Sequence, residues 1–261
     1  MLRIGEITYA NVYPIFHELK KYTGYKFVSS VPSVLNKALR EGGIDISPCS
    51  SIEYAKSPDN YLIIPGISIS SLKEVKSVCL FSKCRIDYLK GKKVFLTGDS
   101  GTSVVLLKII IKKFLNIQVI FTNDESDCDG YLYIGDKALF KYYSKEYKYI
   151  YDLGKLWYEF TQLPFVFSLW LLNINCYKER FEELSSFVEL LLKIKNESKR
   201  NLSALIDFYF FKGLSSYQII DYWETIDYRL DDFHIEGLKK YYEFAHEIGE
   251  IKSIPELNFY K

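Results

Sequence analysis

Hydrophobic and polar positions alternate between two periods along the first two thirds of the chain. Residues 3–9 alternate apolar and polar side chains, which is typical of a β-strand, and residues 14–22 then carry apolar side chains at helical spacing. The succession repeats, because Pro32 favours the first turn of a helix that Gly42 and Gly43 end. This alternation predicts βαβ units around a largely parallel sheet, and hence an α/β fold class. Strands are expected at residues 3–9, 25–30, 44–47, 61–64, 93–97, 118–122 and 131–134, and helices at 14–22, 33–41, 102–114 and 137–143, with a short one ending at 55.

Two long apolar segments divide this pattern into two α/β sets. Residues 75–81 lie between the sets and residues 163–170 follow the second set, and both predict extended, buried segments. The rest of the chain is mainly helical. We therefore expect a two-lobed protein with a double crossover and a helical C-terminal tail that packs back on lobe one. Lobe one would hold residues 1–80 and 167–261, lobe two residues 81–166, and a ligand cleft would lie between them. A single doubly wound sheet with a helical appendix fits the same pattern.

Composition and charge narrow the choice of partners. The 261 residues include 34 basic and 33 acidic ones, and a net charge of +1 does not favour nucleic acid or an anionic membrane surface. The longest apolar stretch, residues 164–172, is shorter than the about 20 residues that cross a bilayer. Five cysteines without a Cys-x-x-Cys pair predict reduced, mostly buried thiols and no structural zinc. With no export signal at the start, a cytoplasmic protein is expected.

Familiar catalytic and cofactor motifs do not occur in the sequence. There is no Walker loop and no Gly-x-Gly-x-x-Gly, so no motif supports a nucleotide cofactor. His17, His234 and His246 form no His-Glu-x-x-His pair and are interpreted as solvated or capping side chains. Residues 98–101 (Gly-Asp-Ser-Gly) resemble the nucleophile segment of secreted serine proteases, but here they join a strand to a long helix. A protease is therefore not expected.

Hydroxyl and amide side chains gather at three strand-to-helix turns. Ser100, Thr102 and Ser103 stand where a helix begins, and free backbone N–H groups and the helix dipole favour an anion there. Ordinary capping needs one such residue, so three within four positions favour a ligand. Residues 47–51 and the turn that holds Asn11 repeat this composition, although each alone is typical of a cap or turn. Together they predict a cleft in which neutral donors bind a small anion.

Longer motifs in these segments match a known family. They are Arg3-Ile4-Gly5-x-Ile7-x-Tyr9-x-Asn11-x-x-Pro14, Gly43-Ile44-Asp45-Ile46-Ser47-Pro48-x-Ser50-Ser51-Ile52-Glu53-Tyr54, Pro65-Gly66-Ile67-Ser68-Ile69-Ser70-Ser71, Ser77-Val78, Leu96-Thr97-x-x-Ser100-x-Thr102-Ser103-Val104, Ile134-Gly135-Asp136-x-Ala138-Leu139, Tyr151-Asp152-Leu153-Gly154-x-x-Trp157-Tyr158 and Leu163-Pro164-Phe165-Val166-Phe167. In this order they resemble the chorismate dehydratases of the futalosine route to menaquinone biosynthesis. The resemblance covers residues 3–172, and the tail after residue 175 adds little.

The resemblance implies both a fold and an activity. The fold is the periplasmic-binding-protein-like type 2 fold, which agrees with the two-lobed pattern. The activity is that of a hydro-lyase, a carbon–oxygen lyase that converts the dicarboxylate chorismate into 3-[(1-carboxyvinyl)oxy]benzoate and water, without metal or organic cofactor. A sister family that makes 1,4-dihydroxy-6-naphthoate and a non-catalytic anion-binding protein of the same fold are the alternatives. The segments at residues 9–11 and 47–54 look more like the dehydratase.

The chemistry of this implied reaction, together with the composition of the matching loops, gives a hypothesis for the site residues. Asn11 is expected to orient one carboxylate, and Ser77 to hydrogen-bond the other carboxylate or the departing hydroxyl, so these two are the catalytic candidates. The substrate's own enolpyruvyl carboxylate is expected to take the C3 proton, because the matching loops hold no well-placed His, Glu or Lys. Asp136 is expected either to contact the C4 hydroxyl or to cap its helix. The expected substrate-binding residues are Ser50, Ser51, Ser100, Thr102, Ser103, Gly135 and Asp136.

Overall fold

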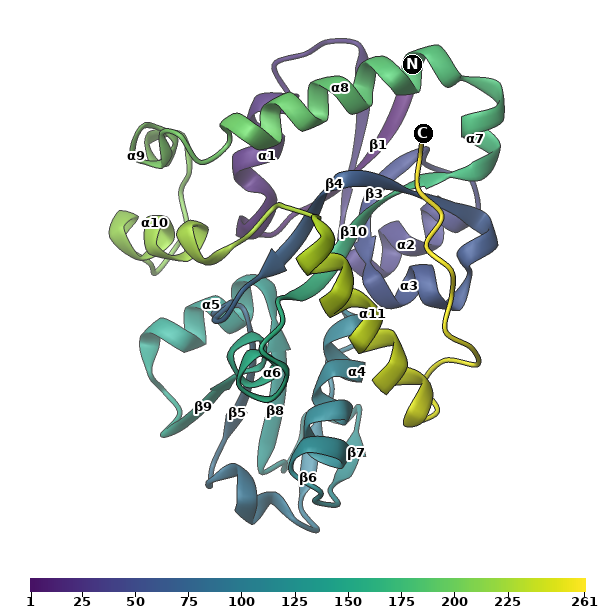
Figure 1. Cartoon of the computed structure of the whole chain (residues 1–261). Helices are drawn as coiled ribbons and strands as arrows, with labels where there is room; N and C mark the ends of the chain where they lie inside the picture. Colours follow the sequence, from purple (N-terminus) through teal and green to yellow (C-terminus); the bar gives the residue numbers. More distant parts are fainter.

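Two five-stranded sheets organise the chain, and each forms the centre of one lobe in a computed structural model that describes residues 1–261 (Figure 1). The first sheet has the order β2-β1-β3-β10-β4, with β1 (Leu2–Ile7), β2 (Tyr25–Ser30), β3 (Ile46–Ser50), β4 (Tyr61–Ser71) and β10 (Phe165–Asn173). The second has the order β7-β6-β8-β5-β9, with β5 (Val78–Ser82), β6 (Lys93–Phe95), β7 (Ile120–Thr122), β8 (Gly130–Ile134) and β9 (Tyr149–Asp152). The expected two-lobed α/β fold is confirmed, and the single doubly wound sheet is wrong.

The sheets are mixed rather than largely parallel. Strand β1 pairs in parallel with β2 and β3, and β6 with β7 and β8. Strand β10 runs antiparallel to β3 and β4, and β5 runs antiparallel to β8 and β9. The prediction of a largely parallel sheet is wrong at these two strands. A βαβ unit sets strand direction only within one sheet, whereas β5 and β10 each enter their sheet from the other lobe.

The chain passes between the lobes twice. The first passage joins β4, which ends at Ser71, to β5, which begins at Val78. The second leads from α6 (Leu153–Thr161) to β10, which begins at Phe165. The finer lobe boundaries, residues 1–80 with 167–261 against 81–166, stay a prediction.

Helices cover the faces of both sheets and form the tail. In the first two thirds they are α1 (Tyr13–Leu19), α2 (Pro32–Arg40), α3 (Ser51–Lys56), α4 (Gly101–Ile109), α5 (Gly135–Ser144) and α6. The tail adds α7 (Ile174–Glu179), α8 (Phe181–Glu197), α9 (Leu202–Leu205), α10 (Ser216–Thr225) and α11 (Asp232–Glu247). Pro32 stands in the first turn of α2 as expected. Helix α4 continues into one π-helical turn, Ile110–Phe114. No helix is long and apolar enough to cross a membrane.

The tail packs on both lobes, not on lobe one alone. Helix α8 contacts α1 and β4 of the first lobe, but α11 lies against β10, α3 and also α4 of the second lobe (Figure 1). Two polar contacts strengthen the packing on α4, because the Tyr241 hydroxyl donates to the Thr102 carbonyl at 3.2 Å and Lys108 pairs with Glu250 at 2.8 Å. The tail therefore takes part in holding the two lobes together.

Two expectations about single side chains have different outcomes. Four of the five cysteines are buried and Cys84 is half-buried, which confirms the expectation of mostly buried thiols. His234, however, is 1% exposed, and its two ring nitrogens lie 2.7 Å from Asp231 and 3.2 Å from Asp227. These carboxylates raise the pKa of His234 against the effect of its burial. The prediction of a solvated or capping histidine is wrong here, because two acidic side chains compensate the buried ring.

Candidate active site

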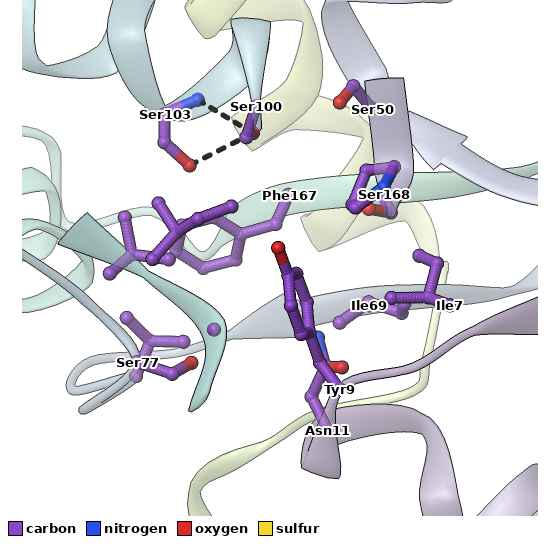
Figure 2. A pocket seen from close by; sticks show the side chains of 15 residues that line it. Ile7, Tyr9, Asn11, Ser50, Ile69, Ser77, Ser100, Ser103, Phe167 and Ser168 are labelled. Atoms are coloured by element: carbon purple, nitrogen blue, oxygen red, sulfur yellow. Dashed lines mark hydrogen bonds between the residues drawn. The ribbon is translucent and has the colours of Figure 1, made fainter. Parts of the chain in front are cut away.

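A cleft lies between the two sheets. The first lobe lines it from the end of β1 and from β3, β4 and β10, and the second lobe from β5, the end of β8 and the start of α4. The site therefore lies at the interface between the lobes, as expected. Six of the predicted site residues line it: Asn11, Ser50, Ser77, Ser100, Ser103 and Gly135. The first five are labelled in Figure 2.

One side of the cleft is formed by the N-terminus of α4, with Ser50 at the end of β3 nearby (Figure 2). The Ser100 hydroxyl caps the helix, accepting the Ser103 N–H at 3.3 Å, and the two hydroxyl oxygens lie 3.1 Å apart. Capping thus accounts for Ser100, while the hydroxyls of Ser50 and Ser103 also line the cleft. Hydroxyl donors beside a helix N-terminus suit a carboxylate, because the helix dipole adds to their hydrogen bonds. We call Ser50, Ser100 and Ser103 the helix side.

The opposite side is formed by Asn11 and Ser77 (Figure 2). Asn11 lies in the short 3₁₀ turn Ala10–Val12 that follows β1, and its Oδ1 is buried without a hydrogen-bond partner. Nearly all buried polar groups in proteins are paired, so an unpaired amide oxygen on a cleft wall points to a ligand. We call Asn11 and Ser77 the crossover side, because Ser77 lies on the first passage between the lobes.

The backbone before Ser77 is tightly constrained. Lys76 has a left-handed φ of 59°, and the Ser77 N–H donates to the Val75 carbonyl at 2.7 Å. The Asp152 carboxylate accepts the N–H groups of Val75 at 3.0 Å and of Lys76 at 2.6 Å. Burial raises the pKa of Asp152 to about 6, although these hydrogen bonds lower it. The strained turn therefore has a fixed geometry, and it places Ser77 in the cleft.

Tyr9 and Gly135 make a close contact between the lobes. Gly135 has φ +58°, and a Cβ atom on it would lie 2.9 Å from the ring carbons of Tyr9. Only glycine permits both this backbone conformation and this approach. Burial, with nearby Asp99 and Asp136, raises the pKa of Tyr9 to about 12, so its hydroxyl keeps its proton. Tyr9 is part of a matched motif, but the sequence reasoning did not single it out as a site residue.

Three predicted site residues do not line the cleft. The Ser51 hydroxyl donates to the Val166 carbonyl at 2.8 Å and lies 3.3 Å from Thr102 Oγ1, which accepts the Ile52 N–H at 3.0 Å. Both hydroxyls are buried and join α3 to α4 across the lobes. Asp136 accepts the Ala10 N–H at 2.9 Å, and burial raises its pKa. Asp136 therefore does not cap its own helix and does not line the cleft. Its carboxylate is instead hydrogen-bonded to the loop that follows β1.

The apolar walls of the cleft were not predicted. Pairing between β10 and β4 shifts register between Val166 and Ser168, and such a bulge re-aims the side chains beside it. Phe167 and Ser168 line the cleft at this point. A register shift leaves no pattern in the sequence. Phe167 ends a matched motif, but the sequence reasoning singled out neither side chain as a site residue. The apolar lining residues are Ile7, Pro32, Ile69, Val75, Val78, Ile134 and Phe167.

The lining side chains carry no formal charge. The polar ones are Tyr9, Asn11, Ser50, Ser77, Ser100, Ser103 and Ser168, and Tyr9 alone is titratable. No group of three or more His, Cys, Asp or Glu side chains lies close enough to hold a metal ion. The cleft can therefore bind and orient an anion through neutral dipoles, and none of its own side chains is a base at neutral pH.

Comparison with known sequences gives one consistent description. A family described as menaquinone biosynthesis matches residues 2–247. The chorismate dehydratase of Thermus thermophilus is 34% identical over 188 residues, which cover 64% of this chain and 68% of that protein. The chorismate dehydratase of Campylobacter jejuni is 35% identical over 171 residues, which cover 63% of this chain and 64% of that protein.

Comparison with solved structures concerns the fold. An Archaeoglobus fulgidus protein superposes with a TM-score of 0.77 at 18% identity, over 96% of this chain and 98% of that one. A Candida albicans protein described as having the generic periplasmic-binding-protein fold superposes with a TM-score of 0.71 at 12% identity, over 100% of this chain and 97% of that one. The periplasmic aliphatic sulphonate-binding protein of Escherichia coli superposes with a TM-score of 0.62 at 16% identity, over 100% of this chain and 93% of that one. These likenesses confirm the periplasmic-binding-protein-like fold.

Proposed function

The chain belongs to the menaquinone biosynthesis family, and on that premise we propose that it is a chorismate dehydratase, a hydro-lyase that converts chorismate into 3-[(1-carboxyvinyl)oxy]benzoate and water. The observation that carries the proposal is the lining of the cleft. Neutral donors stand on two opposite sides of it, and no lining side chain is an acid or a base at neutral pH. Such a site suits a dicarboxylate whose reaction needs orientation and charge stabilisation more than a protein base.

The chemistry of chorismate fits this lining. Its ring carboxylate is conjugated to C1=C2, C3 carries a hydrogen, and C4 carries a hydroxyl. When the C3–H bond breaks, the electron pair moves into the conjugated carboxylate. The C4–O bond then breaks, the hydroxide leaves as water with that proton, and the ring becomes aromatic. Because no net oxidation occurs, the proposal includes no redox partner. Preorganised donors assist by stabilising the transient charge.

We assign the two carboxylates to the two sides of the cleft. The helix side binds one of them through Ser50, Ser100 and Ser103, with the dipole of α4 behind it. On the crossover side, the side-chain N–H of Asn11 orients the other, and Ser77 donates to it or to the departing hydroxyl. The unpaired Asn11 Oδ1 is an acceptor and suits a hydroxyl of the substrate. The tight contact of Tyr9 with Gly135 supports exclusion of water when the lobes are closed.

The substrate supplies the proton acceptor in this scheme. The enolpyruvyl carboxylate lies close to C3 within chorismate itself. Tyr9 is the one titratable lining group, and its pKa of about 12 leaves it protonated and unable to act as a base at neutral pH. Asp136 accepts a backbone hydrogen bond outside the lining. These observations support a substrate-assisted proton transfer.

The direct test is to mix the purified protein with chorismate and to follow the products by chromatography and mass spectrometry. We expect a new aromatic species that is lighter than chorismate by one water. Unchanged chorismate with folded protein would contradict the proposal. Calorimetry on the same sample would then show whether the protein binds chorismate without converting it, as a binding protein of this fold would.

A further inference from the structure

The main chain of Ser77 is fixed on both sides. Its N–H donates to the Val75 carbonyl at 2.7 Å, and its own carbonyl accepts the Gly135 N–H at 2.8 Å. Ser77 is 3% exposed, so neighbouring atoms also restrict its side chain. The remaining freedom is the direction in which the hydroxyl proton points. That direction decides whether Ser77 can donate a hydrogen bond into the cleft.

Tyr222 controls this direction from the C-terminal tail. It lies on α10, is 1% exposed, and its hydroxyl donates to Ser77 Oγ at 2.8 Å. A phenol is a stronger donor than an aliphatic alcohol, so the serine oxygen accepts this bond. The Ser77 proton must then point away from Tyr222, and the cleft is the other side that Ser77 lines.

The segment after Tyr222 contacts the turn of Asn11, the other residue of the crossover side. The indole N–H of Trp223 donates to the Ala10 carbonyl at 2.8 Å, and the Tyr228 hydroxyl donates to the Asn11 carbonyl at 2.6 Å. Both side chains are buried. One short piece of the tail thus contacts both Ser77 and the turn of Asn11, which lie far from it in the sequence.

We infer that Tyr222 is a positioning residue, which holds the Ser77 hydroxyl as a donor toward the carboxylate or departing hydroxyl of the substrate. The inference rests on the proposed function, because it concerns what Ser77 does in that reaction. It also adds a role for a region outside the matched motifs, which end before residue 175. Tyr222 does not line the cleft, so it acts through Ser77 alone.

The test uses Tyr222→Phe, which keeps the ring and its packing and removes only the hydroxyl. We expect kcat to fall about tenfold with KM within about twofold, because the Ser77 proton loses its fixed direction. Tyr54→Phe is the matched control. Tyr54 is also a buried tyrosine, but it does not line the cleft. Its hydroxyl donates to the Glu256 carbonyl at 2.7 Å. This control should keep the parent kcat.

A double-mutant cycle with Ser77→Ala separates positioning from a general structural effect. In the Ser77→Ala background, Tyr222→Phe should change kcat by less than about twofold, because no hydroxyl remains to be positioned. An equal loss in both backgrounds would overturn the inference, as would an unchanged kcat in the single variant. Thermal melting of all four proteins shows whether a loss of folding contributes.

Failure of the proposed function is distinguishable from failure of this inference. If the parent does not convert chorismate, the proposed function is wrong, and the same four proteins are titrated with chorismate by calorimetry. An about tenfold loss of affinity in Tyr222→Phe that is absent in the Ser77→Ala background would support positioning for binding. Equal affinities, or no binding by the parent, would overturn it.

Discussion

The two sides of the cleft are built in different ways. On the helix side, Ser100 and Ser103 are three positions apart, and one cap hydrogen bond arranges them. On the crossover side, Asn11 and Ser77 come from two separate turns, and tail residues 217 and 145 positions away hold them. The difference indicates that local sequence forms the Ser100–Ser103 part of the helix side, to which tertiary packing adds Ser50, whereas both residues of the site for bond breaking depend on long-range packing. Loss of a side chain should therefore affect binding on one side and turnover on the other.

The largest expected effect lies on the crossover side. Asn11→Ala and Ser77→Ala should each lower kcat about 100-fold, as removal of one preorganised donor does in other enzymes. Steady-state formation of the aromatic product measures this, with circular dichroism as the check on folding. Turnover within a few-fold of the parent would contradict the assignment of these two residues. Loss of turnover in Asp136→Asn without loss of folding would instead require a protein acid or base.

On the helix side, the expected effect is on binding. Ser103→Ala should raise KM about tenfold and leave kcat within about threefold, because a hydrogen bond to a charged group is worth about 1.5–3 kcal/mol. Ser186→Ala, which removes an exposed hydroxyl on α8, is the control and should change neither constant. A fall in kcat equal to that of Ser77→Ala would mean that the two sides do not differ.

Thr102, the residue next to Ser103, is expected to affect stability where Ser103 affects binding. Thr102→Val keeps the shape of the side chain but removes the acceptor of the buried Ile52 N–H. We expect the free energy of unfolding to fall by about 1–3 kcal/mol, the usual effect of an unsatisfied buried donor. Ser103→Ala should change it by less than about 1 kcal/mol. Urea unfolding of the two variants measures the difference, and equal stabilities would show that Thr102 does not support the lobe interface.

The smallest expected effect is that of pH on turnover. A raised pKa of about 12 means that Tyr9 loses its proton only in strong alkali, and free carboxylates are ionised above about pH 5. We therefore expect kcat to change less than about twofold between pH 6.5 and 9, in the parent and in Tyr9→Phe. A single ionisation within this range, found in the parent alone, would indicate a protein base and contradict substrate-assisted proton transfer.

Much of the fold was predictable because short-range patterns carry it. The strand at residues 25–30 and the helix that Pro32 opens were found from periodicity and a single turn residue. The strand β9 and the helices α6, α7 and α10 were missed. In β9 three of the four residues are only half-buried, so its strand pattern is weak. The direction of β5 and β10 was also missed, because it depends on the passage between lobes.

In the candidate site, too, short-range features were predictable from the sequence and long-range contacts were not. The sequence alone indicated hydroxyls at the start of a helix, the turn of Asn11 and the fold class, since caps, turns and periodicity act over a few residues. The tertiary structure alone decided that Ser50 faces the cleft while Ser51 does not. It also decided that Tyr222 contacts Ser77. Adjacent side chains on a chain entering a helix point in different directions, and which direction meets a partner depends on elements that packing brings from far along the chain.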